Sequence, residues 1–143
     1  MKVAISAAIA AAVILAPADF AAAQDVTKGQ QIFNQCHLCH RIGDGATNLI
    51  GPVLNNVIGR QAGTYAGFNY SPLMKAAGQN GLVWTEDLMV QYIADPTVFL
   101  KQYLTDKGKA DLATSSSLMT FKLLDEQQRK DVVSYEATFS QKK

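Results

Sequence analysis

The two cysteines and two histidines of this chain all lie within one pentapeptide, Cys36-His37-Leu38-Cys39-His40. This segment is therefore the main candidate for thiol or metal chemistry in the 143 residues. Two cysteines are too few for a scaffold held by several disulfides. The formal net charge of +1 argues against nucleic acid as a partner, because phosphate contacts require clustered lysines and arginines.

The spacing C-x-x-C-H is the signal for covalent attachment of a c-type haem. Cysteines three residues apart on a helical turn point the same way, so both thiols can add to the vinyl groups on one porphyrin edge. His40 directly follows the second cysteine and is carried beneath the ring centre, where it can bind iron. His37 lies between the cysteines, and we expect it to face solvent.

Three other interpretations of the pentapeptide are weaker. A thioredoxin-like dithiol requires a βαβ context, which the sequence does not provide. A disulfide between Cys36 and Cys39 would close a loop too small to stabilise the chain much. A zinc site needs four ligands from two separated pairs, and the sequence has no second pair. We therefore predict one haem c, attached through Cys36 and Cys39.

Residues 1–23 have the three parts of a secretory signal peptide: basic Lys2, an apolar run over 3–16, and an A-x-A cleavage site that ends at Ala23. The alternative is a membrane anchor, but the apolar run is shorter than the roughly 20 residues that cross a bilayer. We expect cleavage of this segment, export to the bacterial periplasm, and a mature domain over 24–143.

Helical signals dominate the mature chain. Residues 41–70 are rich in glycine, asparagine and proline, and they predict ordered loop with short helical turns. A polar loop is predicted over 108–117. The predicted helical core is thin for so much irregular chain, so something else is expected to fill the centre. Apolar spacing and capping residues predict helices over 25–35, 71–77, 85–95, 97–107 and 125–139.

The function of the haem depends on its sixth iron ligand, for which the soft candidates are Met74, Met89 and Met119. Met74 and Met89 fall in predicted helices, where a role in the core is the simpler interpretation. Met119 lies in the loop SSSLMTFKL before the last helix, where apolar neighbours can lay it over a buried ring. The residue pattern favours Met119 and leaves the other two open.

Further motifs follow one another along the whole mature chain: Gly29-x-x-x-Phe33, the pentapeptide, Gly51-Pro52-x-Leu54, Gly59-Arg60, Phe68-x-Tyr70-Ser71, Leu82-x-Trp84-x-Glu86-Asp87, Tyr92, Ser117-Leu118-Met119-Thr120-Phe121 and Tyr135. In this order they resemble the class I c-type cytochromes, in particular the bacterial cytochrome c2 group related to mitochondrial cytochrome c. The resemblance implies an all-α, single-domain fold whose N- and C-terminal helices cross around one covalently bound haem. Gly29 would allow the two helices to approach closely.

The resemblance also assigns roles to individual residues. It implies that Met119 is the axial ligand paired with His40. It places Pro52 behind His40, with the carbonyl region that precedes this proline accepting the imidazole N–H. The other implied haem contacts are the propionate donors Arg60, Tyr70, Trp84 and Ser117, Tyr92 with its hydroxyl directed at the Met119 sulfur, and Phe121 packed over the haem edge.

The chain departs from the family pattern at two places. Leu118 stands before the implied axial methionine, where the family often has lysine, and this weakens the positive charge beside the exposed haem edge. Residues 101–116 look like an insertion relative to the mitochondrial type, as in the larger bacterial members. Its lysines are interpreted either as part of a docking face or as a solvated loop.

The resemblance implies a monomeric electron carrier and not an enzyme, because two filled axial positions leave the iron no place for oxygen or peroxide. The implied partners are a cytochrome bc1-type reductase and a terminal oxidase or photosynthetic reaction centre, which dock transiently. One rival is a haem enzyme or gas sensor with five-coordinate iron. A second rival is a c-type subunit of a larger periplasmic oxidoreductase.

Overall fold

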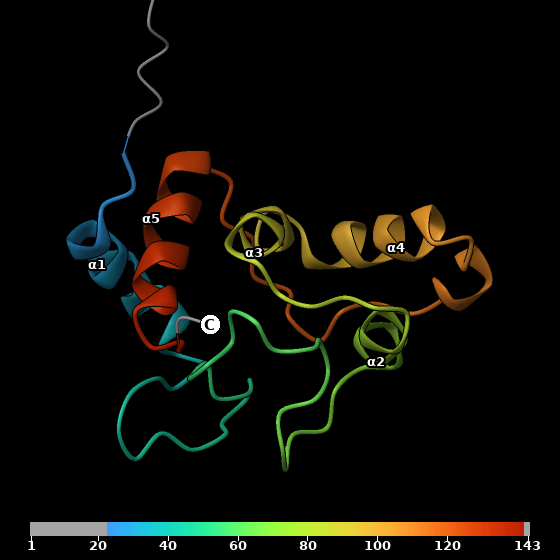
Figure 1. The fold of residues 1–143 in the computed structure, drawn as a ribbon, viewed down its shortest axis with the longest axis horizontal. Helices are drawn as coiled ribbons and strands as arrows, with labels where there is room; N and C mark the ends of the chain where they lie inside the picture. Colours follow the sequence, from blue (N-terminus) through green and yellow to red (C-terminus); the bar gives the residue numbers. More distant parts are fainter. Residues whose placement is uncertain (1–22, 142–143) are drawn as a thin grey trace, which may run out of the picture.

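A computed structural model describes residues 23–141 of the chain (Figure 1). The predicted signal peptide falls outside this range except for its last residue. In these described residues the only β pairing is one antiparallel bridge between Gln61 and Val83, and the predicted all-α class is confirmed. The elements are α1 (Val26–Cys36), α2 (Pro72–Gln79), α3 (Glu86–Tyr92), α4 (Pro96–Asp106), the 3-10 helix η1 (Ala110–Leu112) and α5 (Glu126–Ala137).

The α-helices begin where the sequence places a capping side chain. In each case that side chain accepts a hydrogen bond from the backbone N–H three residues further on, which a helix start would otherwise leave unpaired. Pro72 and Pro96 occupy the first turns of α2 and α4, where a missing N–H costs nothing. The capping residues are Asp25, Ser71, Thr85, Asp95 and Asp125.

The first and last helices, α1 and α5, make the most extensive contact between elements (Figure 1). Gly29 is buried at their crossing, where a Cβ would overlap the carbonyl oxygen of Asp131 and lie 2.9 Å from the Cβ of Tyr135. Phe33, one turn later, packs against Tyr135 with ring centroids 5.3 Å apart. The predicted crossing of the terminal helices is therefore present, and Gly29 sets its separation.

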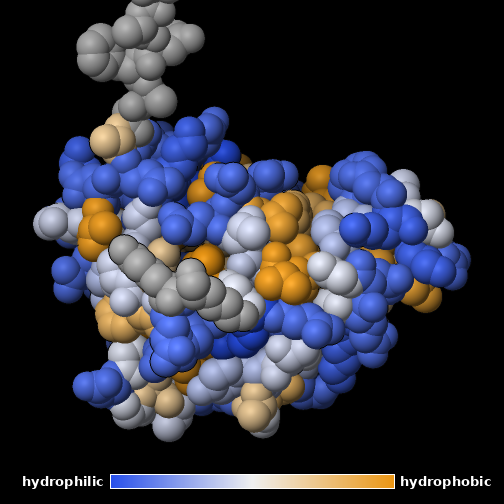
Figure 2. All heavy atoms as spheres, viewed as in Figure 1, coloured by the Kyte–Doolittle hydropathy of each residue, from blue (hydrophilic) through white to orange (hydrophobic). Residues whose placement is uncertain are grey.

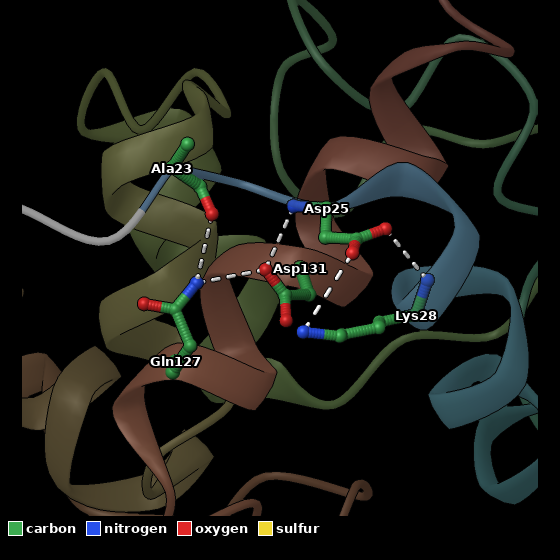
Figure 3. A network of polar contacts seen from close by, with 5 residues as sticks. All are labelled: Ala23, Asp25, Lys28, Gln127 and Asp131. Atoms are coloured by element: carbon green, nitrogen blue, oxygen red, sulfur yellow. Dashed lines mark hydrogen bonds and ion pairs between the residues drawn. The ribbon is translucent and has the colours of Figure 1, made fainter.

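Polar contacts fasten the start of α1 to α5 (Figure 3). Asp131 is buried, and its Oδ1 accepts hydrogen bonds from the Asp25 backbone N–H at 2.9 Å and from Gln127 Nε2 at 2.8 Å. Gln127 also donates to the Ala23 carbonyl at 3.3 Å. The Asp25 carboxylate caps α1 and lies 3.7 Å from the Lys28 ammonium. The start of α1 is thus held at a defined place on the last helix.

Helices α2, α3 and α4 form a second group beside the α1–α5 pair, and the long segment 41–70 runs across the other end of the molecule (Figure 1). This segment is loop with short hydrogen-bonded turns and contains no full helix. In two of these turns the N–H groups of Val57 and Arg60 donate to the carbonyls of Leu54 and Val57, both at 3.1 Å. Most of the visible face is hydrophilic, with a hydrophobic patch beside α3 (Figure 2). Over 23–141, no helix has the length and apolar character needed to cross a membrane.

Candidate cofactor site

A cavity of about 290 Å³ lies between the two helix groups, and residues of the Cys36–His40 pentapeptide line it. The walls come from every α-helix except α4 and from the loops 41–70 and 117–123. All the residues that the sequence singled out for the site line this cavity: Cys36, Cys39, His40, Pro52, Arg60, Tyr70, Trp84, Tyr92, Ser117, Met119 and Phe121.

The attachment motif is a tight turn at the end of α1. The backbone N–H groups of Cys39 and His40 both donate to the Cys36 carbonyl, at 3.0 and 2.9 Å. Both cysteines are free and half-buried, and His37 is exposed, as predicted. Burial, with a smaller contribution from the charge of Glu136, raises the pKa of Cys36 to about 12. This thiol therefore stays protonated and available for addition of S–H across a double bond.

His40 is held so that one ring nitrogen donates a hydrogen bond and the other has no partner among residues 23–141. Its Nδ1 donates to the carbonyl of Pro52 at 2.8 Å, and an acceptor at that position requires the proton to be on Nδ1. Nε2 is then left as a lone-pair donor for a metal. Burial lowers the pKa of His40, so the neutral imidazole is favoured. The sequence analysis expected the acceptor to be the carbonyl region that precedes Pro52. In the structure the acceptor is the carbonyl of Pro52 itself, one peptide further along the chain.

Gly51 fixes the position of this imidazole. A Cβ at Gly51 would lie 2.7 Å from His40 Nδ1 and 2.8 Å from Nε2. We therefore expect Gly51→Ala to displace the ring, weaken its bond to Pro52, and destabilise the haem-loaded protein by about 1–3 kcal/mol. Denaturant unfolding and the high-spin fraction of the visible spectrum measure the two effects.

Leu49→Ala, at an exposed neighbour, is the control for Gly51→Ala and should keep the wild-type spectrum and stability. A fully low-spin Gly51→Ala protein of wild-type stability would contradict the position that the structure gives to His40.

The loop that carries Met119 is tied to α3 and α4 through Ser117. The Ser117 N–H donates to Thr97 Oγ1 at 3.1 Å, and its hydroxyl accepts from the Met119 N–H at 3.1 Å. The Tyr92 hydroxyl lies 3.4 Å from Ser117 Oγ. The sequence interpretation directed Tyr92 at the Met119 sulfur, whereas here its partner is the serine that orients Met119. Burial raises the pKa of Tyr92 to about 12, so this hydroxyl remains a donor.

A second pair of contacts fixes the far end of the same loop. The Leu123 N–H donates to the Ile93 carbonyl at 2.8 Å, and Lys122 pairs with Asp95 at 2.6 Å. Met119 is therefore held between two anchored points. Met74 and Met89 also line the cavity, but they belong to α2 and α3 and are packed in the buried core.

The polar wall of the cavity centres on Arg60. Its guanidinium donates to the carbonyls of Asn55 and Val53, both at 3.1 Å, and lies 4.7 Å from the centre of the Tyr65 ring. Burial lowers the pKa of Arg60, and further N–H donors of the fork are left after these two bonds. The guanidinium thus stabilises the loop and brings positive charge to the cavity.

The aromatic members of the wall are packed against one another. The rings of Trp84 and Tyr92 are 4.8 Å apart, and so are those of Phe68 and Tyr70. Burial raises the pKa of Tyr70, so its hydroxyl is also kept protonated. This part of the wall is therefore mainly aromatic, and its tyrosine hydroxyls supply polar groups.

One charged residue of the site was not predicted from the sequence. Glu136 on α5 is 4% exposed and lines the cavity. It follows the buried Val132 and Val133 by four and three residues, which is the spacing of one helix face. That spacing was the available signal that this carboxyl is turned inward.

The residues at the cavity fit a covalently bound haem. Two unbridged cysteines, an imidazole with a free nitrogen and an uncharged thioether all reach the same apolar space. Among residues 23–141, no three histidine, cysteine or acidic side chains gather as a metal site of their own. The donor set suits a metal held by a macrocycle and does not suit a bare zinc ion.

Comparisons with known proteins agree over nearly all of the described chain. The Cytochrome c family model matches residues 26–138. A cytochrome c2 from Rhodopseudomonas palustris is 57% identical over 115 residues, covering 80% of this chain and 98% of that protein. The structure of cytochrome c2 from Rhodospirillum centenum has a TM-score of 0.81 and 51% identity, covering 82% of this chain and 99% of that one. Ferricytochrome c2 from Rhodopseudomonas palustris has a TM-score of 0.78 and 56% identity, covering 82% and 100%.

Proposed function

Because the chain belongs to the cytochrome c family, and to its cytochrome c2 group, we propose that it is a periplasmic electron carrier whose haem iron is ligated by His40 and Met119. The family is one of electron-transfer proteins and not of enzymes. It implies one haem c, for which Cys36 and Cys39 are the attachment residues. When bound, this group supplies a one-electron couple.

The observation that carries the proposal is the orientation of His40. Its 2.8 Å bond to the Pro52 carbonyl leaves the opposite nitrogen free, and that nitrogen would bind the iron with increased basicity. Ser117 holds the backbone of Met119, and Tyr92 contacts Ser117. These contacts would keep the thioether in place in both oxidation states of the iron. Fixed ligands in an apolar cavity keep the rearrangement that accompanies electron transfer small.

The remaining lining residues are proposed to enclose the haem. Aromatic and aliphatic side chains exclude water, which favours the less charged, reduced state of the iron. Phe121, which is 39% exposed at the cavity, is proposed to shield its edge. Arg60, Tyr70, Trp84 and Ser117 are proposed as donors to the propionates, which need partners in an apolar interior.

The proposed partners are a cytochrome bc1-type reductase and a terminal oxidase or photosynthetic reaction centre. Three exposed apolar side chains line the cavity and border its mouth: Leu38 and Ile50 are each 76% exposed, and Leu118 is 63% exposed. A small apolar contact of this kind suits brief docking. With a net charge of +1, we expect only moderate dependence of docking on salt.

Export and attachment are tested together by expressing the full chain with a periplasmic c-type maturation system. The mass of the purified protein should equal residues 24–143 plus one haem, and acid solvent should not extract the haem. A matched variant with both Cys36→Ser and Cys39→Ser should lose the covalent haem. A product that keeps residues 1–23, or a wild-type haem that is extracted, would contradict the proposal.

A further inference from the structure

Glu136 is the one acidic side chain that lines the haem cavity within the described part of the chain. It lies near the end of α5 and is 4% exposed, on the helix face that also buries Val132 and Val133. Cys36, the last residue of α1 and the first of the attachment motif, lines the same cavity. A carboxyl at this position would share the cavity with the haem and would not be needed to ligate the iron.

Among residues 23–141, no charged side chain neutralises Glu136. α5 packs against α1 and α3, and the titratable groups of these helices at the cavity are Cys36 and Tyr92. Across the cavity lie the titratable groups His40, Arg60 and Tyr70. No hydrogen bond or charge from residues 23–141 perturbs the carboxyl, and burial alone raises its pKa to about 8.

The charged residues of α5 are engaged elsewhere. Arg129, two turns before Glu136, donates to the carbonyls of Leu123 and Leu124. Lys130 pairs with Glu126 at 2.6 Å, and Asp131 belongs to the contacts that fasten α1. The carboxyl of Glu136 therefore responds mainly to a charge that appears within the cavity.

We propose that Glu136 is a proton-binding site coupled to the haem iron, which takes up one proton when the protein accepts one electron. The electron comes from the reducing partner, the proton comes from solvent, and the O–H bond forms on the carboxylate. Reoxidation releases both. The net charge inside the cavity is then the same before and after the transfer.

The coupling follows from electrostatics in a medium of low dielectric constant. Ferric haem carries one more positive charge than ferrous haem, and that charge stabilises a nearby carboxylate. Reduction removes it, and the burial penalty on the ionised carboxyl is then unopposed. The pKa of Glu136 is therefore higher in the reduced protein than in the oxidised protein. This step needs the family's covalent haem and does not depend on which methionine binds the iron.

Between these two pKa values, one proton accompanies each electron. The reduction potential should fall as pH rises, by up to about 59 mV for each tenfold decrease in proton concentration. Above and below this interval, Glu136 should no longer make the reduction potential depend on pH.

The test is a redox titration of the haem-loaded protein from about pH 5 to about pH 10, a range that brackets the pKa of about 8. Wild type is compared with Glu136→Gln, which keeps the shape of the side chain and removes its titration. Glu126→Gln, at an exposed position of the same helix, is the control. We expect the slope in wild type and in the control, and its loss in Glu136→Gln. An unchanged slope in Glu136→Gln would overturn the proposal.

Infrared difference spectra between oxidised and reduced protein separate Glu136 from the haem propionates, which are carboxyl groups too. Within the sloping interval, reduction of wild type should produce the C=O stretch of a protonated carboxylic acid. This band should disappear in Glu136→Gln, while propionate bands persist.

Absence of the band in wild type would overturn the proposal even if Glu136→Gln failed to fold. A high-spin visible spectrum at every pH would instead contradict the proposed His40 and Met119 ligation, and so the two failures are distinguishable.

Discussion

Replacing Met119 with alanine is expected to lower the reduction potential by a substantial part of the roughly 0.8 V range that axial ligands span. A thioether ligand raises the potential relative to nitrogen or oxygen ligands, so its loss stabilises ferric iron. The vacated position should also bind carbon monoxide rapidly in the reduced protein. Potentiometric titration and a carbon monoxide difference spectrum measure the two effects.

Met74 and Met89 provide matched controls for this substitution, because both also line the cavity. Leucine has nearly the same volume as methionine, so Met74→Leu and Met89→Leu should keep the core packed. We expect both variants to retain the wild-type potential and to exclude carbon monoxide. If either reproduced the effect expected for Met119→Ala, that methionine would be the ligand and the assignment of Met119 would be wrong.

Gly29→Ala should be strongly destabilising, lowering the free energy of unfolding by about 3 kcal/mol. Alanine in a helix interior gains roughly 1 kcal/mol over glycine, but the added Cβ overlaps the backbone carbonyl of Asp131. Backbone atoms cannot rotate away as a side chain can, so α1 and α5 must separate. The midpoint of guanidinium unfolding of the haem-loaded protein measures the loss.

The control for this effect is Gln30→Ala, at the next position of α1. Gln30 is exposed, so the change should alter the stability by no more than about 0.5 kcal/mol. A Gly29→Ala protein as stable as Gln30→Ala would contradict the close crossing of the terminal helices.

The starts of the helices were predictable, because a cap is local chemistry. Asp25, Thr85 and Asp125 each act on a backbone N–H only three residues away. The ends were less predictable, because distant residues decide them. The helix predicted over 85–95 ends at Tyr92, and the carbonyl of the next residue, Ile93, accepts from Leu123.

The members of the candidate site were predictable, but their mutual contacts were not. The C-x-x-C-H spacing alone predicts haem attachment at the pentapeptide. The other predicted lining residues came from the family resemblance. The partner of the Tyr92 hydroxyl depends on how the 117–123 loop lies on α3. Hydrophobic periodicity in the sequence does not predict that placement. Glu136 escaped because a charged residue on a helix is ordinarily assigned to solvent.

The segment interpreted as an insertion, 101–116, contains the second part of α4 and the 3-10 helix η1. Lys107 lies over the Tyr103 ring, with its ammonium 5.4 Å from the ring centre. The segment is therefore built on α4 and extends that helix away from the α1–α5 pair (Figure 1). If its lysines belong to a docking face, replacing them should change the salt dependence of electron transfer. If they belong to a solvated loop, that dependence should stay the same.

The most direct test of the central claim is the visible absorption spectrum of the exported protein, oxidised and reduced, with carbon monoxide added to the reduced sample. Ligation by His40 and Met119 predicts a low-spin c-type spectrum, a weak sulfur-to-iron band in the oxidised form, and no response to carbon monoxide. A high-spin spectrum or a rapid shift with carbon monoxide would reveal an open iron position. That result would contradict the carrier mechanism and favour ligand sensing or peroxide chemistry.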